Sequence, residues 1–127
     1  MRYLFDNCIS PKFVHMLCAL GEDVVSLREE YPEGIQDVPL FEKLRGRHLV
    51  FVSTDTSQLT REHEARALQR SGNTALYFGP FFEKMTLWDQ AIWIVRRWQK
   101  IKGFAEGVVP GTVAEIKQNG KSLTYRF

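Results

Sequence analysis

Short apolar runs alternate with longer amphipathic segments along the first hundred residues. Four runs of strand length, each flanked by polar or turn-forming residues, cover residues 3–5, 23–27, 48–53 and 74–78. The segments that follow them repeat apolar residues every three or four positions, the period of a helix with one buried face, over residues 11–20, 38–45, 61–70 and 87–102. Strand and helix thus alternate four times, which predicts an α/β fold with a central parallel sheet and right-handed crossovers.

Capping residues mark several of the predicted helix starts. Ser10 precedes Pro11, a pair that suits an N-cap followed by the first helical residue. Thr60 and Thr86 are the predicted N-caps of the third and fourth helices. The polar segment 28–36 contains proline and glycine and is predicted to be a loop.

The C-terminal segment breaks this pattern. Residues 103–127 follow the predicted domain of residues 1–102, beginning with a glycine-containing linker over residues 103–110. Apolar positions on either side of Asn119-Gly120, a turn sequence typical of hairpins, then predict a β-hairpin. Because an isolated hairpin is marginally stable in water, we expect it to dock on the same domain; a second copy of the chain and a partner protein are the alternatives.

Composition narrows the class of protein. With 127 residues, 44% hydrophobic and 25% charged, the chain fits one globular domain, and a net charge of +2 neither requires nor excludes nucleic acid. Cys8 and Cys18, the latter predicted on an apolar helix face, form no disulfide framework and are interpreted as reduced. No apolar stretch approaches the roughly 20 residues of a membrane span, and Asp6 interrupts the start of any signal peptide. We therefore expect a cytoplasmic protein with no membrane partner.

Three aspartates lie where predicted strands and helices meet. Asp6 closes the first strand, Asp55 closes the third, and Asp37 stands directly before the second helix. Since the carboxyl ends of parallel strands meet at one edge of a sheet, we expect the three to form one catalytic and metal-binding site. Carboxylates gathered there either hold a hard cation such as Mg²⁺ or Mn²⁺ or act as an acid/base set. Each one taken alone has a simpler explanation as a cap, a turn or a loop residue.

Polar and basic neighbours of these acids are candidate substrate-binding residues: Asn7, Thr54, Arg61, His63 and Arg66. Arginine binds phosphate oxygens in a bidentate manner, and histidine titrates near neutral pH. Each residue also has an ordinary role in a turn, a strand or a solvated helix face.

The end of the long predicted helix is basic and contains an aromatic residue. The stretch 96–102 carries four basic residues around Trp98, a combination that can bind a nucleic-acid backbone and stack a base. Trp98, however, falls on the apolar stripe of the helix, so we favour packing over binding. Trp88 and Trp93 are predicted to build the core or the surface of a possible homodimer.

The N-terminal two thirds of the chain resembles a known family. The strand, acid and helix start of residues 3–11, with the Leu20-Gly21 step that follows, resemble the opening of PIN-like nuclease domains. Asp37 resembles their second acidic position and Thr54-Asp55 their third. The similarity covers about residues 1–80, and it is greatest to the VapC-type toxins of toxin–antitoxin pairs.

The resemblance implies a PIN-like three-layer α/β/α sandwich and a Mg²⁺- or Mn²⁺-dependent endoribonuclease. RNA is then the substrate and a cognate antitoxin the protein partner. The family pattern often has a fourth acid after the third strand, where this chain has no aspartate. Glu62 and Glu64 are the nearby acids; Glu62 is expected at the surface, and neither is clearly placed.

Two alternatives remain open at this point. A PIN-like domain that has lost catalysis and binds RNA or protein would explain a missing fourth acid. A phosphoacceptor receiver domain would use an aspartate at the end of the third strand, as Asp55 is. That reading needs a second acid where Asn7 stands, a hydroxyl where Gly79-Pro80 stands, and a fifth parallel strand, which the pattern does not predict.

Overall fold

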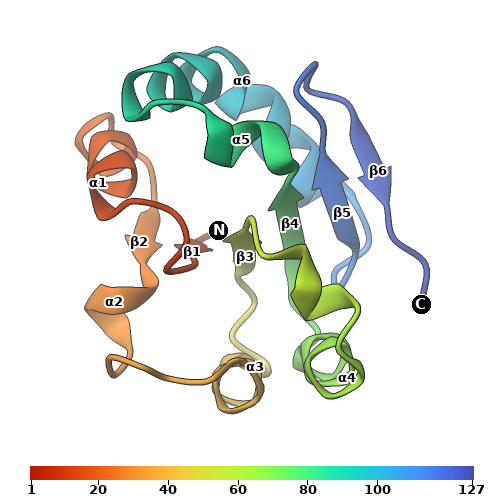
Figure 1. Ribbon diagram of the computed structural model, residues 1–127. Coiled ribbons are helices and arrows are strands. Elements are labelled where there is room, and N and C mark those ends of the chain that lie inside the picture. Colours follow the sequence, from red (N-terminus) through yellow and green to blue (C-terminus); the bar gives the residue numbers. More distant parts are fainter.

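Six strands form one sheet in the order β2-β1-β3-β4-β5-β6 in the computed structural model, which describes residues 1–127 (Figure 1). The first five strands are parallel, and β6 is antiparallel to β5. The strands are β1 (Tyr3–Phe5), β2 (Val24–Ser26), β3 (Val50–Ser53), β4 (Thr74–Phe78), β5 (Val113–Ile116) and β6 (Ser122–Thr124).

Helices cover both faces of the sheet. They are α1 (Pro11–Ala19), α2 (Leu27–Glu30), α3 (Asp37–Leu44), α4 (Glu62–Ser71), α5 (Pro80–Lys84) and α6 (Leu87–Gly107), with a 3₁₀ turn η1 (Thr56–Leu59). Figure 1 shows α1, α5 and α6 on one face, and α3 and α4 on the other. The expected three-layer α/β/α arrangement with a central parallel sheet is confirmed. None of the helices combines the length and the apolar character that crossing a membrane requires.

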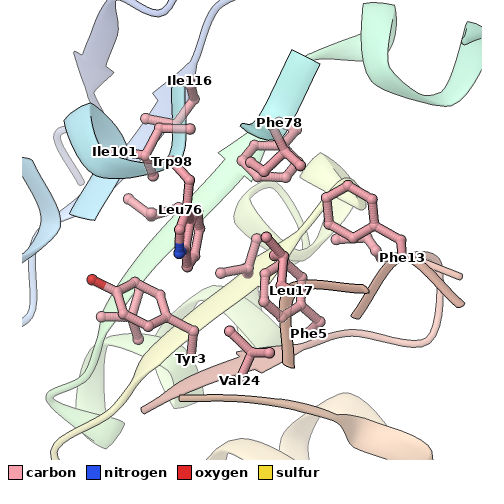
Figure 2. Close-up of a cluster of buried hydrophobic side chains, with 14 of the residues drawn as sticks. Tyr3, Phe5, Phe13, Leu17, Val24, Leu76, Phe78, Trp98, Ile101 and Ile116 are labelled. Carbon is pink, nitrogen blue, oxygen red and sulfur yellow. The ribbon is translucent and has the colours of Figure 1, made fainter. Parts of the chain in front are cut away.

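The layer of α1, α5 and α6 packs an aromatic core against the sheet (Figure 2). The Tyr3 ring meets the Trp98 ring edge-on at 4.9 Å between centroids, and Phe5 lies against Phe13. Trp98 is only 3% exposed, and its indole Nε1 donates to Glu22 at 2.7 Å. The packing interpretation of Trp98 is therefore the right one, because a buried and hydrogen-bonded indole cannot stack on a base.

The opposite layer packs a smaller core beneath α3 and α4. Phe41 of α3 meets Phe51 of β3 edge-on at 5.3 Å. The buried Asn73 donates to the Leu44 carbonyl at 2.7 Å and accepts from the Leu49 amide at 3.1 Å, which ties the end of α3 to the start of β3. This side-chain bridge satisfies backbone groups that no strand partner reaches.

The C-terminal segment corrects two expectations. The long helix α6 continues to Gly107, so the segment predicted to be a linker begins as helix. The predicted hairpin does form, but its first strand β5 pairs in parallel with β4, with Ala75 opposite Val113. A fifth parallel strand is thus present where none was predicted, because a hairpin pattern read locally shows pairing within the hairpin and not pairing with the sheet.

The structure confirms some local expectations and corrects others. The predicted caps Ser10 and Thr86 accept backbone N–H groups, from Lys12 and Asp89, as expected. Thr60 does not cap α4, because its hydroxyl donates to the Ser57 carbonyl instead. The short helices α2 and α5 were not predicted, since each spans too few residues to show a helical period. Cys18 is exposed rather than packed on the apolar face of α1.

Candidate functional site

The strand order reverses between β1 and β3, and this is where the acidic residues gather. The chain leaves β1 outward to β2 and returns to β3 on the other side of β1, with Phe5 paired to Val52. Open α/β sheets bind ligands at such a point, outside the carboxyl ends of the strands. Asp6 directly follows β1 and Asp55 lies two residues beyond Ser53, the last residue of β3. Both acids therefore stand at the mouth of this crevice.

Asp6 is held rigidly. Its side chain is only 7% exposed, and its carboxylate accepts three hydrogen bonds. The donors are the backbone amide of Asn7 at 2.8 Å, the Ser53 hydroxyl at 2.8 Å and the Gln58 side-chain amide at 3.1 Å. These three donors fix the orientation of the carboxylate.

Gln58 is the centre of the site and was not anticipated from the sequence. It lies on η1, is 1% exposed, and donates to Asp6 through Nε2 while its Oε1 accepts from the Tyr77 hydroxyl at 3.0 Å. Burial raises the pKa of Tyr77, and the charges of Asp6, Asp37 and Asp55 raise it further. All three predicted acids therefore lie close enough to Tyr77 to raise its pKa.

Asp37 is the first residue of α3 and is half-buried. Burial raises its pKa most, a hydrogen bond from Gln58 opposes the shift, and the neighbouring charges of Asp6 and Glu64 add to it. The result is a pKa of about 6, well above the ordinary 3.8 of an aspartate. Like charges crowded into one site have this effect because each disfavours the ionised form of the other.

Asp55 also has a local structural role. Its carboxylate caps η1 by accepting from the Ser57 amide at 3.2 Å and from the Ser57 hydroxyl. Its own amide donates to the Ser53 hydroxyl at 3.0 Å, and that hydroxyl in turn donates to Asp6. Ser53 thus couples the position of Asp55 to that of Asp6.

Glu64 is a fourth acid beside these three. It lies in the first turn of α4 with its side chain 17% exposed, whereas that of Glu62 is 76% exposed. Arg61 donates to both of its carboxylate oxygens at 3.0 and 3.1 Å, and Glu64 acts on the pKa of Asp37. Glu64 precedes the buried Leu68 by four residues, and this spacing was the signal in the sequence for an inward-facing acid.

The predicted substrate-binding residues do not form one group. Arg61 stands at the acidic rim, paired with Glu64. Asn7 adjoins Asp6, and its Oδ1 is buried without a hydrogen-bond partner. Thr54 is buried, and its hydroxyl donates to Glu83 at 2.5 Å. His63 and Arg66 instead line a groove between α3 and α4.

The acids share one rim but do not form a ready-made ion cage. No three carboxylates, histidines or cysteines stand close enough together to hold a metal ion by themselves. Asp6 and Asp37 are linked through Gln58, while Glu64 lies beyond Asp37. This spacing suits an ion held by one or two carboxylates and several waters, which is the usual manner for Mg²⁺.

The fold and its rim define an α/β protein with an acidic site at the switch point of a parallel sheet. The model of the PIN-like domain family matches residues 1–79, which is more than half of the chain. The chain therefore belongs to the PIN-like domain family, whose members are generally nucleases and hence hydrolases. Comparisons with curated proteins and with solved structures give no significant match.

Proposed function

We propose that the protein is a metal-dependent endoribonuclease that hydrolyses RNA phosphodiester bonds. The observation that carries the proposal is the convergence of Asp6, Asp37, Asp55 and Glu64 on one rim around Gln58. A structural cap needs no second carboxylate beside it, and the cost of crowding these charges is relieved when a cation binds. Nucleases of this family supply the reaction class.

A hard divalent cation such as Mg²⁺ or Mn²⁺ fits this donor set. The carboxylate ligands are oxygens, and the charges of Asp6 and Glu64 add to the effect of burial in raising the pKa of Asp37. Asp6, Asp37 and Asp55 would hold the ion, directly or through its waters. When bound, the ion activates water and stabilises the charge that develops on the phosphate.

The remaining side chains orient the substrate and the acids. Ser53 and Gln58 fix the carboxylate of Asp6, so that it need not reorganise during the reaction. Arg61 lies at the rim and can donate to a phosphate oxygen, while Glu64 holds its guanidinium in place. The Oδ1 of Asn7 is buried without a hydrogen-bond partner, and it would have to turn outward to accept from a water or a ribose hydroxyl.

The test is cleavage of a pool of structured and single-stranded RNA, with Mn²⁺ or with chelator. We expect wild-type protein to cut only with metal, and Asp6→Asn and Glu64→Gln each to reduce the rate on the order of 100-fold or more, since each removes an interaction worth several kcal/mol in the transition state. Asp89→Asn is the matched control, because Asp89 is an exposed acid on α6, in the opposite layer.

Folding of each variant is checked by circular dichroism. Cleavage that persists in chelator, or that Asp6→Asn and Asp89→Asn reduce equally, would contradict the proposal. The Glu64→Gln result separately tests the fourth acid. Because Glu64 lies beside Asp37, the absence of a fourth acid no longer favours a PIN-like domain without catalysis.

The receiver-domain alternative gains one feature and still lacks two. The parallel strand β5 exists, and Lys117 follows it, but the Lys117 ammonium is paired with Glu115 at 3.0 Å. Asn7 stands where a second acid is needed, and Gly79 where a hydroxyl is needed. A small phosphodonor is therefore expected to leave Asp55 unmodified.

We further propose that the nuclease is the toxin of a toxin–antitoxin pair, inhibited by a cognate antitoxin in the cytoplasm. The support is the similarity of the three acidic positions to those of VapC-type toxins. Induced expression in a bacterial host tests this directly. Wild-type protein is expected to arrest growth and Asp6→Asn to permit it, and growth unaffected by well-expressed, RNA-cleaving wild-type protein would remove the toxin role while leaving the nuclease.

A further inference from the structure

A groove runs between α3 and α4 on the outer surface of their layer. Both helices lead from the carboxyl ends of the strands toward the other edge of the sheet, and their far ends meet where the Gly46 amide donates to the Ser71 carbonyl at 3.3 Å. Figure 1 shows the two helices side by side below the sheet. The groove encloses about 420 Å³.

Basic side chains from both helices converge on this groove. Arg45 contributes from the residue just after α3, and His63, Arg66 and Arg70 contribute from α4. The acidic lining residue is Glu42. Arg66 is paired with Glu62, whereas Arg45 and Arg70 are exposed and make no ion pair. The groove therefore has at least two guanidinium groups free for an anion.

One end of the groove lies next to the acidic rim along both helices. Its lining begins at Val38 and His63, each adjacent in sequence to an acid of the rim, Asp37 and Glu64. Arg45 lies eight residues along α3 from Asp37, which is about 12 Å at the helical rise. A polyanion that enters the rim thus meets the arginines further along the same path.

The floor of the groove indicates which part of a nucleic acid it would contact. Phe41 is fully buried beneath it, and Ala67 is only 7% exposed. Phe41 and Ala67 therefore offer no face for a base to stack on, and His63 is the one exposed ring in the lining, whereas sites that grip successive bases use several aromatic faces. Guanidinium groups along a groove with so little stacking surface suit phosphates, which carry no sequence information.

We infer that the α3–α4 groove binds the phosphodiester backbone of a nucleic-acid strand that continues from the acidic rim. This inference rests on the proposed nuclease function for its substrate class. It adds that the strand runs along α3 and α4, that Arg45 and Arg70 contact phosphates, and that binding there is independent of base sequence. An acidic protein segment is the competing occupant.

The test measures binding without cleavage. The full chain, in chelator, is titrated with fluorescent twelve-nucleotide single strands of two unrelated sequences, each as RNA and as DNA, from 0.05 to 1 M KCl. The variant is Arg45→Gln/Arg70→Gln, and the matched control is Arg96→Gln/Lys100→Gln, which removes two exposed positive charges from α6. Both double variants change the net charge equally.

We expect the groove variant to reduce the slope of log affinity against log salt by about 1.4, since each phosphate contact with a single strand contributes about 0.7. If the affinities are equal at 1 M salt, this slope makes the loss about 25-fold at 0.1 M. The loss should be the same for RNA and DNA, and the control variant should retain the wild-type slope.

Three results would overturn the inference: equal losses in the groove and control variants, unchanged binding in the groove variant, or a loss confined to one base sequence. Loss of binding to a glutamate-rich peptide with unchanged nucleic-acid binding would assign the groove to an acidic protein. The proposed nuclease fails separately. If the protein binds nucleic acid through Arg45 and Arg70 but does not cleave RNA, the nuclease is rejected and the groove inference stands. If it cleaves RNA with metal but binds equally well without the groove arginines, the nuclease stands and the groove inference is rejected.

Discussion

The two helical layers of this protein treat charge in opposite ways. On the α1–α6 side, Glu22 accepts hydrogen bonds from both Trp98 and Lys102, and Tyr3 donates to Glu106 at 2.7 Å. The basic stretch 96–102, dense in the sequence, is dispersed around a helix and partly neutralised. On the α3–α4 side, residues distant in sequence gather into an acidic rim and a basic groove, where Arg61 and Arg66 are paired with glutamates of α4 but Arg45 and Arg70 make no ion pair.

This difference shows that charge density along a chain is a poor guide to charge density in space. A helix turns 100° per residue, so adjacent basic residues point in different directions. Residues spaced by three, four and seven, such as His63, Arg66 and Arg70, share a face even though the sequence between them is mixed. We therefore assign stability mainly to the α1–α6 layer and function to the α3–α4 layer, and the following predictions test this division.

The largest expected effect is on stability, from Trp98→Ala. Removing a buried indole should lower the free energy of unfolding by about 3–5 kcal/mol, as large-to-small changes of aromatic core residues do. Urea denaturation measures this loss. RNA cleavage per folded molecule should be retained at low temperature, and a loss of activity larger than the loss of folded protein would contradict the division of roles.

Gln58→Leu should impair both stability and activity. The change leaves the buried Tyr77 hydroxyl without its acceptor and removes one of the two donors to Asp6 Oδ2, which keeps the Ser53 hydroxyl, at a cost of about 1–3 kcal/mol. Gln69→Leu, an exposed change on α4, is the control and should have little effect. Chemical denaturation together with the RNA assay distinguishes them, and a Gln58→Leu protein of wild-type stability would show that the network is not needed for folding.

Asp37→Asn should stabilise the metal-free protein at neutral pH while abolishing cleavage. The folded pKa of about 6 lies above the ordinary 3.8, so the folded state binds a proton more readily than the unfolded state does. The unfolding free energy of wild type therefore falls as pH rises from about 4 to about 6, and the penalty is complete above that range.

The advantage of the asparagine variant should accordingly grow by about 1 kcal/mol between pH 4 and pH 7, a value well below the full shift because the carboxyl is half-exposed. Thermal unfolding of both proteins at a series of pH values in chelator provides the measurement. An advantage that shrinks with rising pH would mean that folding does not raise the pKa of Asp37.

Glu22→Gln should have the smallest effect. Hydrogen bonds from Lys102 first and Trp98 second hold the pKa of Glu22 below its ordinary 4.5. Its stabilising contribution is therefore present at neutral pH and is lost as pH falls through this lowered pKa. The loss at pH 7 should be less than about 1 kcal/mol, because the pair is partly solvated. The denaturation curves of variant and wild type should differ at pH 7 and lie closer together at pH 3.

Much of the fold follows from local signals. The four apolar runs, the caps Ser10 and Thr86 and the turn at Asn119-Gly120 each act within a few residues, and the structure has all of them. The parallel pairing of β5 did not follow, because it depends on where a helix of 21 residues returns the chain. Pairing with a distant strand has no local pattern.

The residues of the candidate site could likewise be predicted only in part. The positions of Asp6, Asp37 and Asp55 follow from the rule that parallel strands share their carboxyl edge. Gln58 gave no signal, since a polar residue in a presumed loop looks the same whether it is exposed or buried. Glu64 gave a weak signal, which is its spacing of four residues from Leu68. The more prominent pattern of charges on α4 concealed this signal. Arg45 and Arg70 could be recognised as neighbours in one groove only from the packing of α3 against α4.

The pairing of the first strand with the third also governs the order in which the site can assemble during synthesis. Asp6 leaves the ribosome early, but its partners Ser53 and Gln58 are made about fifty residues later. At the usual 5–20 residues per second this delay is roughly 3–10 s. Throughout that interval Asp6 remains hydrated and β3, which pairs with β1, has not been made. A nascent chain therefore has no acidic site until its first half is complete.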